Sequence, residues 1–384
     1  MKGIRISILM VCACLLQVAR GQQSASTVAT NWRQFHGVNM QRFNPFEQVL
    51  NVNNVGSLQR KWGHATGRFV DSSPAVVNGV VYVGTTDHNV YALKAGTGAK
   101  LWSFQTGGHV TSSPAVANGV VYVGSWDNNL YALNASTGAK LWSYTTGGFV
   151  ESSPAVANGV VYVGSYDGKV YALKASTGAL LWSYTTGRTV YSSPAVANGV
   201  VYIGSDDSNM YALNASTGAL LWSSSIGEPV DSSPAVANGV VYVGSDYDHV
   251  YALNASTGAL LWSYTIGYGV TSSPAVANGV VYVGAFDNNV YALNASTGAL
   301  LWSYTTGSFV ESSPTVANGV VYVGSWDHNV YALNASTGAK LWTYTTGNEV
   351  ISSPTVANGV VYVGSADGKV YAFGLKKMRS KVIW

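Results

Sequence analysis

Residues 112–147 read SSPAVANGVVYVGSWDNNLYALNASTGAKLWSYTTG, and close copies of this stretch recur with a period of 40 residues. A fixed period of this length is typical of a protein built from repeated supersecondary units. We therefore expect one repetitive body, not the two or three domains that 384 residues would suggest. Eight copies are present, and their Ser-Ser-Pro segments begin at Ser72, Ser112, Ser152, Ser192, Ser232, Ser272, Ser312 and Ser352.

Each copy contains four predicted strands. In the quoted copy the first strand begins at Pro114, where the missing N–H is tolerated, and Asn118-Gly119 is a two-residue hairpin signal. Residues 120–124 (VVYVG) form the second strand and residues 130–133 (LYAL) the third. Residues 141–146 (LWSYTT) form the fourth, with aromatic side chains on alternate positions. Four antiparallel strands in 40 residues match the size of one propeller blade.

The two ends of the repeat region complement each other. The eighth copy continues into YAFGLKKMRS (371–380) and lacks a fourth strand, whereas LQRKWGHATG (58–67) supplies one before the first copy. We predict an all-β fold, an eight-bladed β-propeller of four-stranded antiparallel blades. The N-terminal strand, at about 59–66, completes the last blade and removes the open edge. The propeller repeats cover 70–375, and residues 22–69 form an N-terminal segment that includes the closing strand.

Composition and charge exclude several classes of protein. Glycine (43 residues), tyrosine (25) and tryptophan (12) are abundant and only 10% of residues are charged, which argues against disordered, collagen-like and coiled-coil chains. Residues 1–21 hold three of the 20 basic residues and no acid, so the remainder carries 17 basic and 17 acidic residues. A neutral chain lacks the electrostatic footprint of a nucleic-acid-binding protein. The tail at 376–384 is either a solvated end or a contact for an anionic or membrane partner; its basic residues are Lys376, Lys377, Arg379 and Lys381.

Residues 1–21 are typical of a secretory signal peptide. A basic start is followed by the apolar run ISILMVCACLLQVA (6–19), and Ala19 and Gly21 are small residues suited to cleavage before Gln22. We therefore predict export to the periplasm or the extracellular space. Both cysteines lie in this segment, so the cleaved chain has no disulfide, thiolate nucleophile, haem attachment or cysteine-bound zinc. Lipid attachment at Cys14 is the alternative.

The fourth strand and the turn before it carry a family resemblance. ALNASTGALLWSYTTG (292–307) resembles the tryptophan-docking motif of the pyrroloquinoline quinone (PQQ) repeat family, in which a Trp lies between neighbouring blades. The motif's acidic position is Asn or Lys here, as at Asn294, and the Asn-Ala-Ser sequons that result are either turn chemistry or glycosylation sites. The resemblance implies a structural docking role for Trp62, Trp102, Trp142, Trp182, Trp222, Trp262, Trp302 and Trp342.

The copies differ mainly in two connections, which alternating strand directions place at the same end of the ring. A variable surface on a uniform scaffold is where recognition is expected. The residue before each Ser-Ser-Pro leads into the innermost strand and therefore lies near the axis. In alternate copies it is an acid. These four carboxylates either form a cation site with raised pKa values or face solvent after duplication of an 80-residue unit; they are Asp71, Glu151, Asp231 and Glu311, and Tyr191 occupies the same position in the fourth copy.

The second variable connection, farther from the axis, presents aromatic side chains. Aromatic residues beside acids suit contacts with sugars, peptides or proteins, although they can equally cover the ends of strands. The aromatic candidates are Trp126, Tyr166, Phe286 and Trp326. The stretch 31–56, which lies outside the repeats, is expected to pack across the ring or against one rim.

No catalytic motif accompanies the repeats. The six histidines share no HxH or HExxH spacing, and the P-loop, the GxSxG elbow and the EF-hand loop are absent from the sequence. Resemblance to PQQ-dependent dehydrogenases implies PQQ, calcium, a catalytic Asp, long insertions and an adjacent cysteine pair. Neither the insertions nor a cysteine after residue 21 occurs here.

We therefore expect a non-catalytic, monomeric scaffold that binds a protein partner. Its length and blade number resemble the exported outer-membrane assembly propellers of the BamB type. A quinoprotein dehydrogenase and a carbohydrate-binding propeller are the alternatives.

Overall fold

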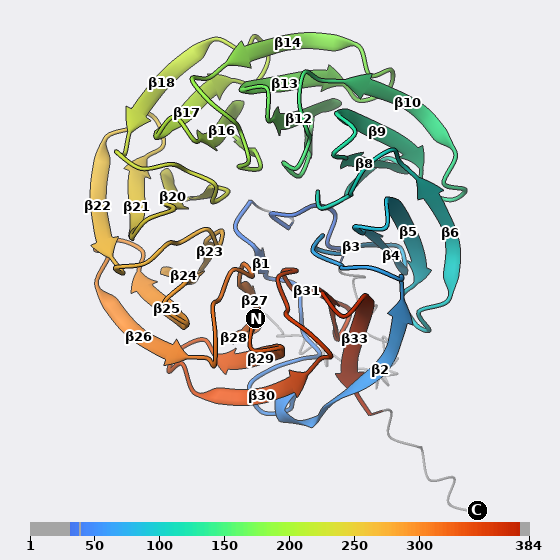
Figure 1. The fold of residues 1–384 in the computed structure, drawn as a ribbon. Coiled ribbons are helices and arrows are strands. Elements are labelled where there is room, and N and C mark those ends of the chain that lie inside the picture. The colour runs from blue at the N-terminus through green and yellow to red at the C-terminus, as the bar shows by residue number, and fades with distance from the viewer. Residues whose placement is uncertain (1–30, 38–39, 377–384) are drawn as a thin grey trace, which may run out of the picture.

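The computed structural model describes residues 31–37 and 40–376 and confirms the predicted architecture. Eight four-stranded antiparallel blades surround a central axis, and the shortest of the four strands is innermost in each blade (Figure 1). Strands are given from the axis outward. Blade 1 contains β3 (Ala75–Val77), β4 (Val80–Gly84), β5 (Asn89–Lys94) and β6 (Lys100–Gln105), and blade 2 contains β7 (Ala115–Ala117), β8 (Val120–Gly124), β9 (Asn129–Asn134) and β10 (Lys140–Thr145). Blade 3 contains β11 (Ala155–Ala157), β12 (Val160–Ser165), β13 (Lys169–Lys174) and β14 (Leu180–Thr185), and blade 4 contains β15 (Ala195–Ala197), β16 (Val200–Ser205), β17 (Asn209–Asn214) and β18 (Leu220–Ser225).

The ring is closed by the N-terminal strand, as predicted. Strand β2 pairs antiparallel with β33 and so becomes the outer strand of blade 8. Blade 5 contains β19 (Ala235–Ala237), β20 (Val240–Gly244), β21 (His249–Asn254) and β22 (Leu260–Thr265), and blade 6 contains β23 (Ala275–Ala277), β24 (Val280–Gly284), β25 (Asn289–Asn294) and β26 (Leu300–Thr305). Blade 7 contains β27 (Thr315–Ala317), β28 (Val320–Gly324), β29 (Asn329–Asn334) and β30 (Lys340–Thr345), and blade 8 contains β31 (Thr355–Ala357), β32 (Val360–Ser365), β33 (Lys369–Leu375) and β2 (Leu58–Ala65).

The hairpin signals fold as their chemistry requires. In blade 2 both Asn118 and Gly119 have positive φ angles, 49° and 76°, which is the conformation of a type I′ turn. This turn joins β7 to β8 with a twist that matches the strands. The remaining described elements are the short strand β1 (Phe43–Asn44) and the 3-10 helix η1 (Val55–Ser57). No helix among the described residues is long and apolar enough to cross a membrane.

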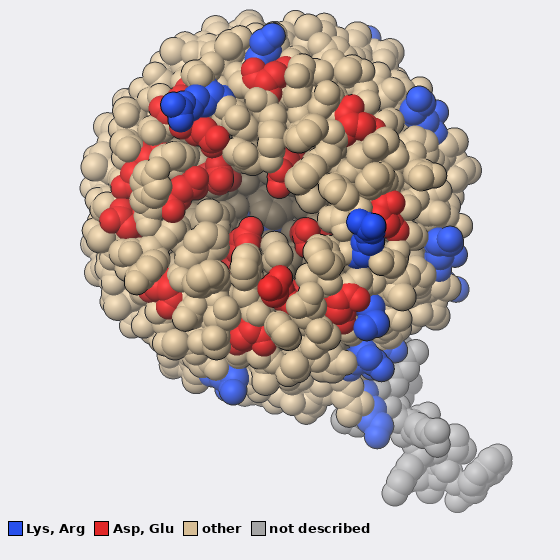
Figure 2. All heavy atoms as spheres, in the orientation of Figure 1, with Lys and Arg blue, Asp and Glu red and all other residues tan. Residues whose placement is uncertain are grey.

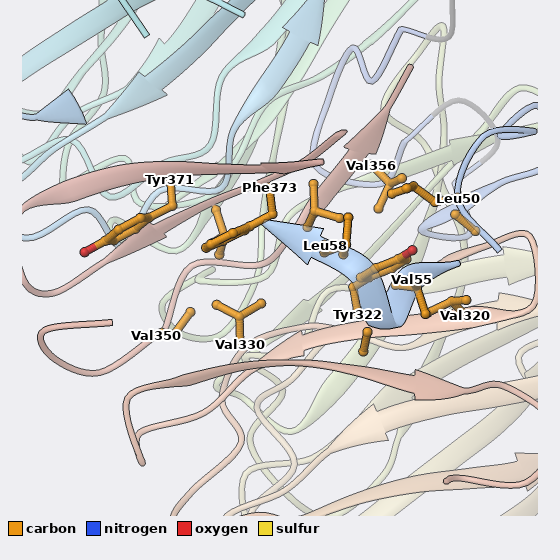
Figure 3. Close-up of a cluster of buried hydrophobic side chains, with 14 residues drawn as sticks. Leu50, Val55, Leu58, Val320, Tyr322, Val330, Val350, Val356, Tyr371 and Phe373 are labelled. Atoms are coloured by element: carbon orange, nitrogen blue, oxygen red, sulfur yellow. The ribbon is translucent and has the colours of Figure 1, made fainter. Parts of the chain in front are cut away.

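The hydrophobic core lies between blades, not within them. One cluster joins Tyr82 and Trp102 of blade 1 to Val121 and Tyr131 of blade 2. Figure 3 shows the cluster between blades 7 and 8, where Leu50 and Val55 of the N-terminal segment join Tyr322 and Phe373. Each blade therefore buries its apolar face only when its neighbour is present, and the closed ring is the unit of stability.

Tryptophan side chains connect each blade to the next. Trp102 of blade 1 donates its indole N–H to the Ala135 carbonyl of blade 2 at 2.9 Å. Gly138 of blade 2 lies against the ring face, and a Cβ at that glycine would lie 2.7 Å from the indole. At the closure, Trp62 on β2 of blade 8 makes the same bond to Ala95 of blade 1 at 2.8 Å.

Two closed rings of hydrogen bonds run around the axis through the Ser-Ser pairs. The Ser72 hydroxyl donates to the Ser112 carbonyl of the next blade at 3.1 Å, and the Ser352 hydroxyl closes this ring on the Ser72 carbonyl at 3.0 Å. In the second ring the Ser353 amide donates to the Ser73 hydroxyl at 3.0 Å. In the sequence these serines served only to mark where each copy begins.

The N-terminal segment follows the inner edges of the blades. Backbone bonds join Trp32 to Val76 in blade 1 and the Arg42 carbonyl to Val316 in blade 7. Between and beyond them, side-chain or backbone bonds reach blades 2, 3, 4, 5, 6 and 8, so this segment touches all eight. The contacted residues lie next to the Asn-Gly turns, and the segment therefore occupies the axis at that end of the ring.

Arg42 anchors this segment without a carboxylate partner among the residues that the structure describes. Its side chain is fully buried and donates to the carbonyls of Phe35 at 2.6 Å and Pro314 at 2.9 Å, while the Thr315 hydroxyl accepts at 2.9 Å. The guanidinium also lies 4.5 Å from the centre of the Phe35 ring. Burial lowers the pKa of Arg42 to about 9.

Candidate functional site

The two variable connections form the face of the ring opposite the Asn-Gly turns. At its centre is a cavity of about 710 Å³, which we call the mouth. Its walls include Phe69, Asp71, Trp126, Glu151 and Glu311, contributed by blades on both sides of the axis. Figure 2 shows this face, with acidic side chains gathered around the central opening.

In blades 2, 3 and 7 the structure pairs the axial side chain with a side chain 15 positions later in the same blade. The Glu151 carboxylate accepts a short hydrogen bond from the Tyr166 hydroxyl, and Glu311 accepts one from the Trp326 indole at 3.1 Å. In blade 2 the Trp126 indole donates to the Thr111 hydroxyl at 3.0 Å. Sequence reasoning singled out both positions but did not predict that they touch.

Burial and like charge raise the pKa values of the acids at the mouth. Burial raises the pKa of Asp71 to about 6, with repulsion from Glu151 and Glu349 adding to the effect. Burial likewise raises the pKa of Glu311 to about 7, although its bond from Trp326 acts in the opposite direction. For Glu151 burial also raises the pKa, and the Tyr166 bond opposes it.

Blade 5 adds a second group of acids to the same face. The backbone N–H of Asp231 donates to Asp246 at 3.3 Å, and burial raises the pKa of both carboxyl groups. Repulsion from Asp206 raises them further. One buried oxygen on each of Asp71, Asp206 and Asp231 has no hydrogen-bond partner within the described part of the chain.

The acids that recur at one turn position provide a contrast. Asp127 accepts hydrogen bonds from the Tyr131 hydroxyl at 2.6 Å and the Gly107 amide at 2.7 Å. Burial alone would raise its pKa, but these bonds and those from Asn129 outweigh it, so the pKa of Asp127 is lowered. Asp127 is therefore satisfied within the fold, whereas Asp71 at the mouth keeps a buried oxygen without a partner among the described residues.

Aromatic rings form a continuous run beside the mouth. Trp126 stacks on Phe149 with 5.4 Å between ring centres, Phe149 lies 5.5 Å from Tyr166, and Tyr166 lies 4.4 Å from Tyr191. His109 extends the run on the far side of Trp126 at 5.2 Å. Blades 2 to 4 thereby present one joined aromatic surface.

A shorter aromatic run lies across the ring. Phe309 is 5.3 Å from Phe286 and 5.5 Å from Trp326. Sequence reasoning named Phe286 and Trp326 but missed both Phe149 and Phe309, each of which is 40% exposed. Variation among the copies could have identified both phenylalanines, because they lie in the variable connection that precedes the innermost strand.

The residues of the mouth do not suit PQQ. That quinone carries three carboxyl groups, and the cavity wall already contains Asp71, Glu151 and Glu311, with Arg68 the one Lys or Arg residue among the described wall residues. Glu151 and Glu311 are each directed to an aromatic partner in their own blade. Among the described residues, the four axial acids do not belong to any group of three ligands close enough to share a metal ion.

Comparison with known proteins agrees with the fold. BamB from Moraxella catarrhalis has a similar structure, with a TM-score of 0.73 and 22% identity over 83% of this chain and 100% of that one. The quinohemoprotein alcohol dehydrogenase from Comamonas testosteroni has a TM-score of 0.79 and 18% identity, covering 92% of this chain and 82% of that one. A computationally designed protein, Ika8, has a TM-score of 0.75 and 20% identity, covering 83% and 100%.

The sequence comparisons identify the family. No curated protein sequence matches the chain. The family model described as "Outer membrane protein assembly factor BamB" matches residues 27–152, 145–229, 206–310 and 305–380, which together span the whole propeller. The chain therefore belongs to this BamB-like family of PQQ-repeat propellers.

Proposed function

We propose that the chain is an exported, non-catalytic propeller that binds a protein partner at the mouth, and that the partner presents basic side chains there. The observation that carries this proposal is the set of unpaired acids. Within residues 31–37 and 40–376, His249 and Lys369 are the only basic side chains in ion pairs, and their partners are other acids. Asp71, Glu151 and Glu311 therefore form no ion pair there.

The walls of the mouth suit a Lys or Arg side chain. A cation between partly buried carboxylates forms charge-assisted hydrogen bonds, which are stronger than neutral ones. Beside the acids, the rings of Trp126, Phe149 and Tyr166 offer faces for cation–π contact. Acids and aromatic rings thus support recognition of the same type of side chain.

The sequence supports the other parts of this proposal. The signal-like segment at 1–21, which lies outside the described residues, supports export to the periplasm or the extracellular space. No insertion interrupts the repeats, and no cysteine follows residue 21. The basic tail, outside the described residues from 377 onward, remains a candidate contact for an anionic or membrane surface. A monomer is expected because the ring closes on itself.

The test is a titration with a synthetic arginine-rich peptide, using an acidic peptide of equal length as the control. A four-acid variant carries Asp71→Asn, Glu151→Gln, Asp231→Asn and Glu311→Gln. We expect the wild type to bind the basic peptide at pH 7.5 and more weakly as salt screens the charges. The four-acid variant should bind at least tenfold more weakly. Equal binding by both proteins would contradict the proposal.

A quinoprotein dehydrogenase is the second candidate, because two of the similar structures are quinohemoprotein alcohol dehydrogenases and share the fold. Calorimetric titration with PQQ, with and without calcium, together with dye reduction by alcohols and sugars, separates the two candidates. The proposed function predicts no dye reduction. Calcium-dependent binding with turnover would replace the scaffold with the enzyme. Sugar binding at the aromatic runs without turnover would favour the carbohydrate-binding alternative.

A further inference from the structure

Blade 5 departs from the repeat at three positions that meet in space. Glu228 stands where the other copies have Gly, Arg, Tyr, Ser or Asn, and Asp248 stands where they have Asn, Gly, Ser or His. His249 replaces an Asn or Lys. The turn itself differs, since the equivalent residue of the other blades has a positive φ and Asp248 does not. The fold does not require these residues, because seven blades form without them.

The three side chains converge on one point. The Nδ1 atom of His249 lies 3.1 Å from a Glu228 oxygen and also against Oδ1 of Asp248. One atom from each residue falls within 4.8 Å of the other two, and no other set of three His, Cys, Asp or Glu residues in the described chain does so. The second Glu228 oxygen is held by the Ser245 hydroxyl.

Hydrogen bonding within the cluster leaves one acceptor unsatisfied. Nδ1 of His249 carries at most one hydrogen, yet two carboxylate oxygens face it. The Oδ1 atom of Asp248 is buried and, in residues 31–37 and 40–376, accepts no hydrogen bond despite its position. Nε2 of His249 lies 3.0 Å from the Thr265 hydroxyl. In metal sites, a hydrogen bond at the ring nitrogen that does not bind the metal orients the imidazole in this way. A cation among the three groups would satisfy all of them together.

We propose that Glu228, Asp248 and His249 form a binding site for a divalent transition-metal ion such as zinc. One imidazole nitrogen and two carboxylate oxygens suit zinc, cobalt or manganese better than calcium, which prefers oxygen alone. Tetrahedral zinc with bonds of about 2.0–2.2 Å places its ligand atoms roughly 3.3–3.6 Å apart. The 3.1 Å between His249 Nδ1 and the Glu228 oxygen would therefore open slightly around the ion, and the closer contact with Asp248 would open further. This site is distinct from the mouth and does not depend on the proposed function.

The site is open enough for an ion to enter. The side chains of Glu228, Asp248 and His249 are 16%, 35% and 25% exposed, so water can complete the coordination. A bound ion would tie the turn at 246–248 to the connection that contains Glu228. The exposed Tyr247 lies in that turn, so the ion would also fix an aromatic side chain on the variable face.

The experiment is metal titration of the full chain without a polyhistidine tag, using Co²⁺ absorption in the visible and Zn²⁺ calorimetry. The test variant combines Glu228→Gly, Asp248→Asn and His249→Asn. Blade 2 carries those same residue types at the equivalent positions and folds with them. We expect one equivalent of Co²⁺ with visible absorption in the wild type, loss of that equivalent in the triple variant, and a tenfold or greater loss of affinity for Thr265→Val.

Two outcomes would overturn the proposal. Equal metal binding by the wild type and the triple variant would place the ion elsewhere, for example among the acids at the mouth. No binding by the folded wild type would mean that the three side chains contact one another without an ion between them. The four-acid variant serves as the cross-check, because it should keep its metal even if it loses the basic peptide.

Discussion

Replacing Trp222 by alanine tests the idea that the propeller is held together between its blades. Trp222 lies in the outer strand of blade 4 and is 9% exposed. Its indole donates to the Ala255 carbonyl of blade 5 at 3.0 Å, and its face covers Gly258, where a Cβ would come within 2.6 Å of the ring. Trp222→Ala therefore removes both a buried surface and a hydrogen bond from the contact between two blades.

The expected loss of stability is large for a single substitution. Burying about 200 Å² of indole contributes at most about 5 kcal/mol, and measured Trp→Ala changes in cores cost about 3–5 kcal/mol. We expect the free energy of unfolding to fall by about 4 kcal/mol. For a propeller of this size, at about 2.1 cal/mol/K per residue, the unfolding entropy is roughly 0.7 kcal/mol/K. The melting temperature should then fall by about 6 °C.

The assay is thermal unfolding followed by circular dichroism and calorimetry. Trp126→Ala is the matched control, because Trp126 lies at the mouth and donates to Thr111 of its own blade. Its melting temperature should change by less than half as much. A Trp222→Ala protein that melts within 1 °C of the wild type would contradict the claim that contacts between blades stabilise the propeller. So would a Trp126→Ala protein that is destabilised as strongly.

Three further predictions concern the axis, the turns and pH. Arg42→Ala should lower the melting temperature clearly, because several buried carbonyls lose their hydrogen-bond donor at once. A variant with the same melting temperature as the wild type would contradict the anchoring role of Arg42. Gly138→Ala should cost about 1 kcal/mol or more beyond Gly119→Ala by denaturant unfolding, since both glycines have positive φ but only Gly138 faces an indole. Burial raises the pKa of Asp71 to about 6 and of Glu311 to about 7, so the folded chain holds protons that the unfolded chain releases near pH 4. This contribution to stability is present below pH 4 and is lost by about pH 7. The wild type therefore loses stability as the pH rises from 4.5 to 7.5, and the melting temperature of the four-acid variant should rise relative to that of the wild type. A difference in melting temperature that stays constant over this range would contradict the raised pKa values.

The sequence alone predicts the blade count and the closure, because these depend on local signals. The 40-residue period, the Asn-Gly turns and the missing eighth outer strand each have a direct structural meaning. The serine rings are different. Ser72 and Ser112 meet because the blades curve around an axis, and no local pattern encodes that curvature.

The candidate site was predicted only in part for the same reason. Variation among the copies predicted that the two variable connections share one face of the ring, and it singled out most of the aromatic residues there. It did not predict that Glu151 bonds to Tyr166, since strand alternation places both at one end without giving their separation. The cluster at Glu228 and His249 was also missed, because its members are 21 residues apart and match no spacing motif.

The most direct test of the account is photo-crosslinking in cells that produce the protein. A benzophenone amino acid replaces Phe149 beside the mouth or, as the control, Leu221, which is 51% exposed on the outer strand of blade 4. We expect a discrete protein adduct from position 149, none from position 221, and loss of the adduct in the four-acid variant. An adduct that forms only at position 221, or one that survives in the four-acid variant, would contradict the claim that the acidic mouth binds the partner.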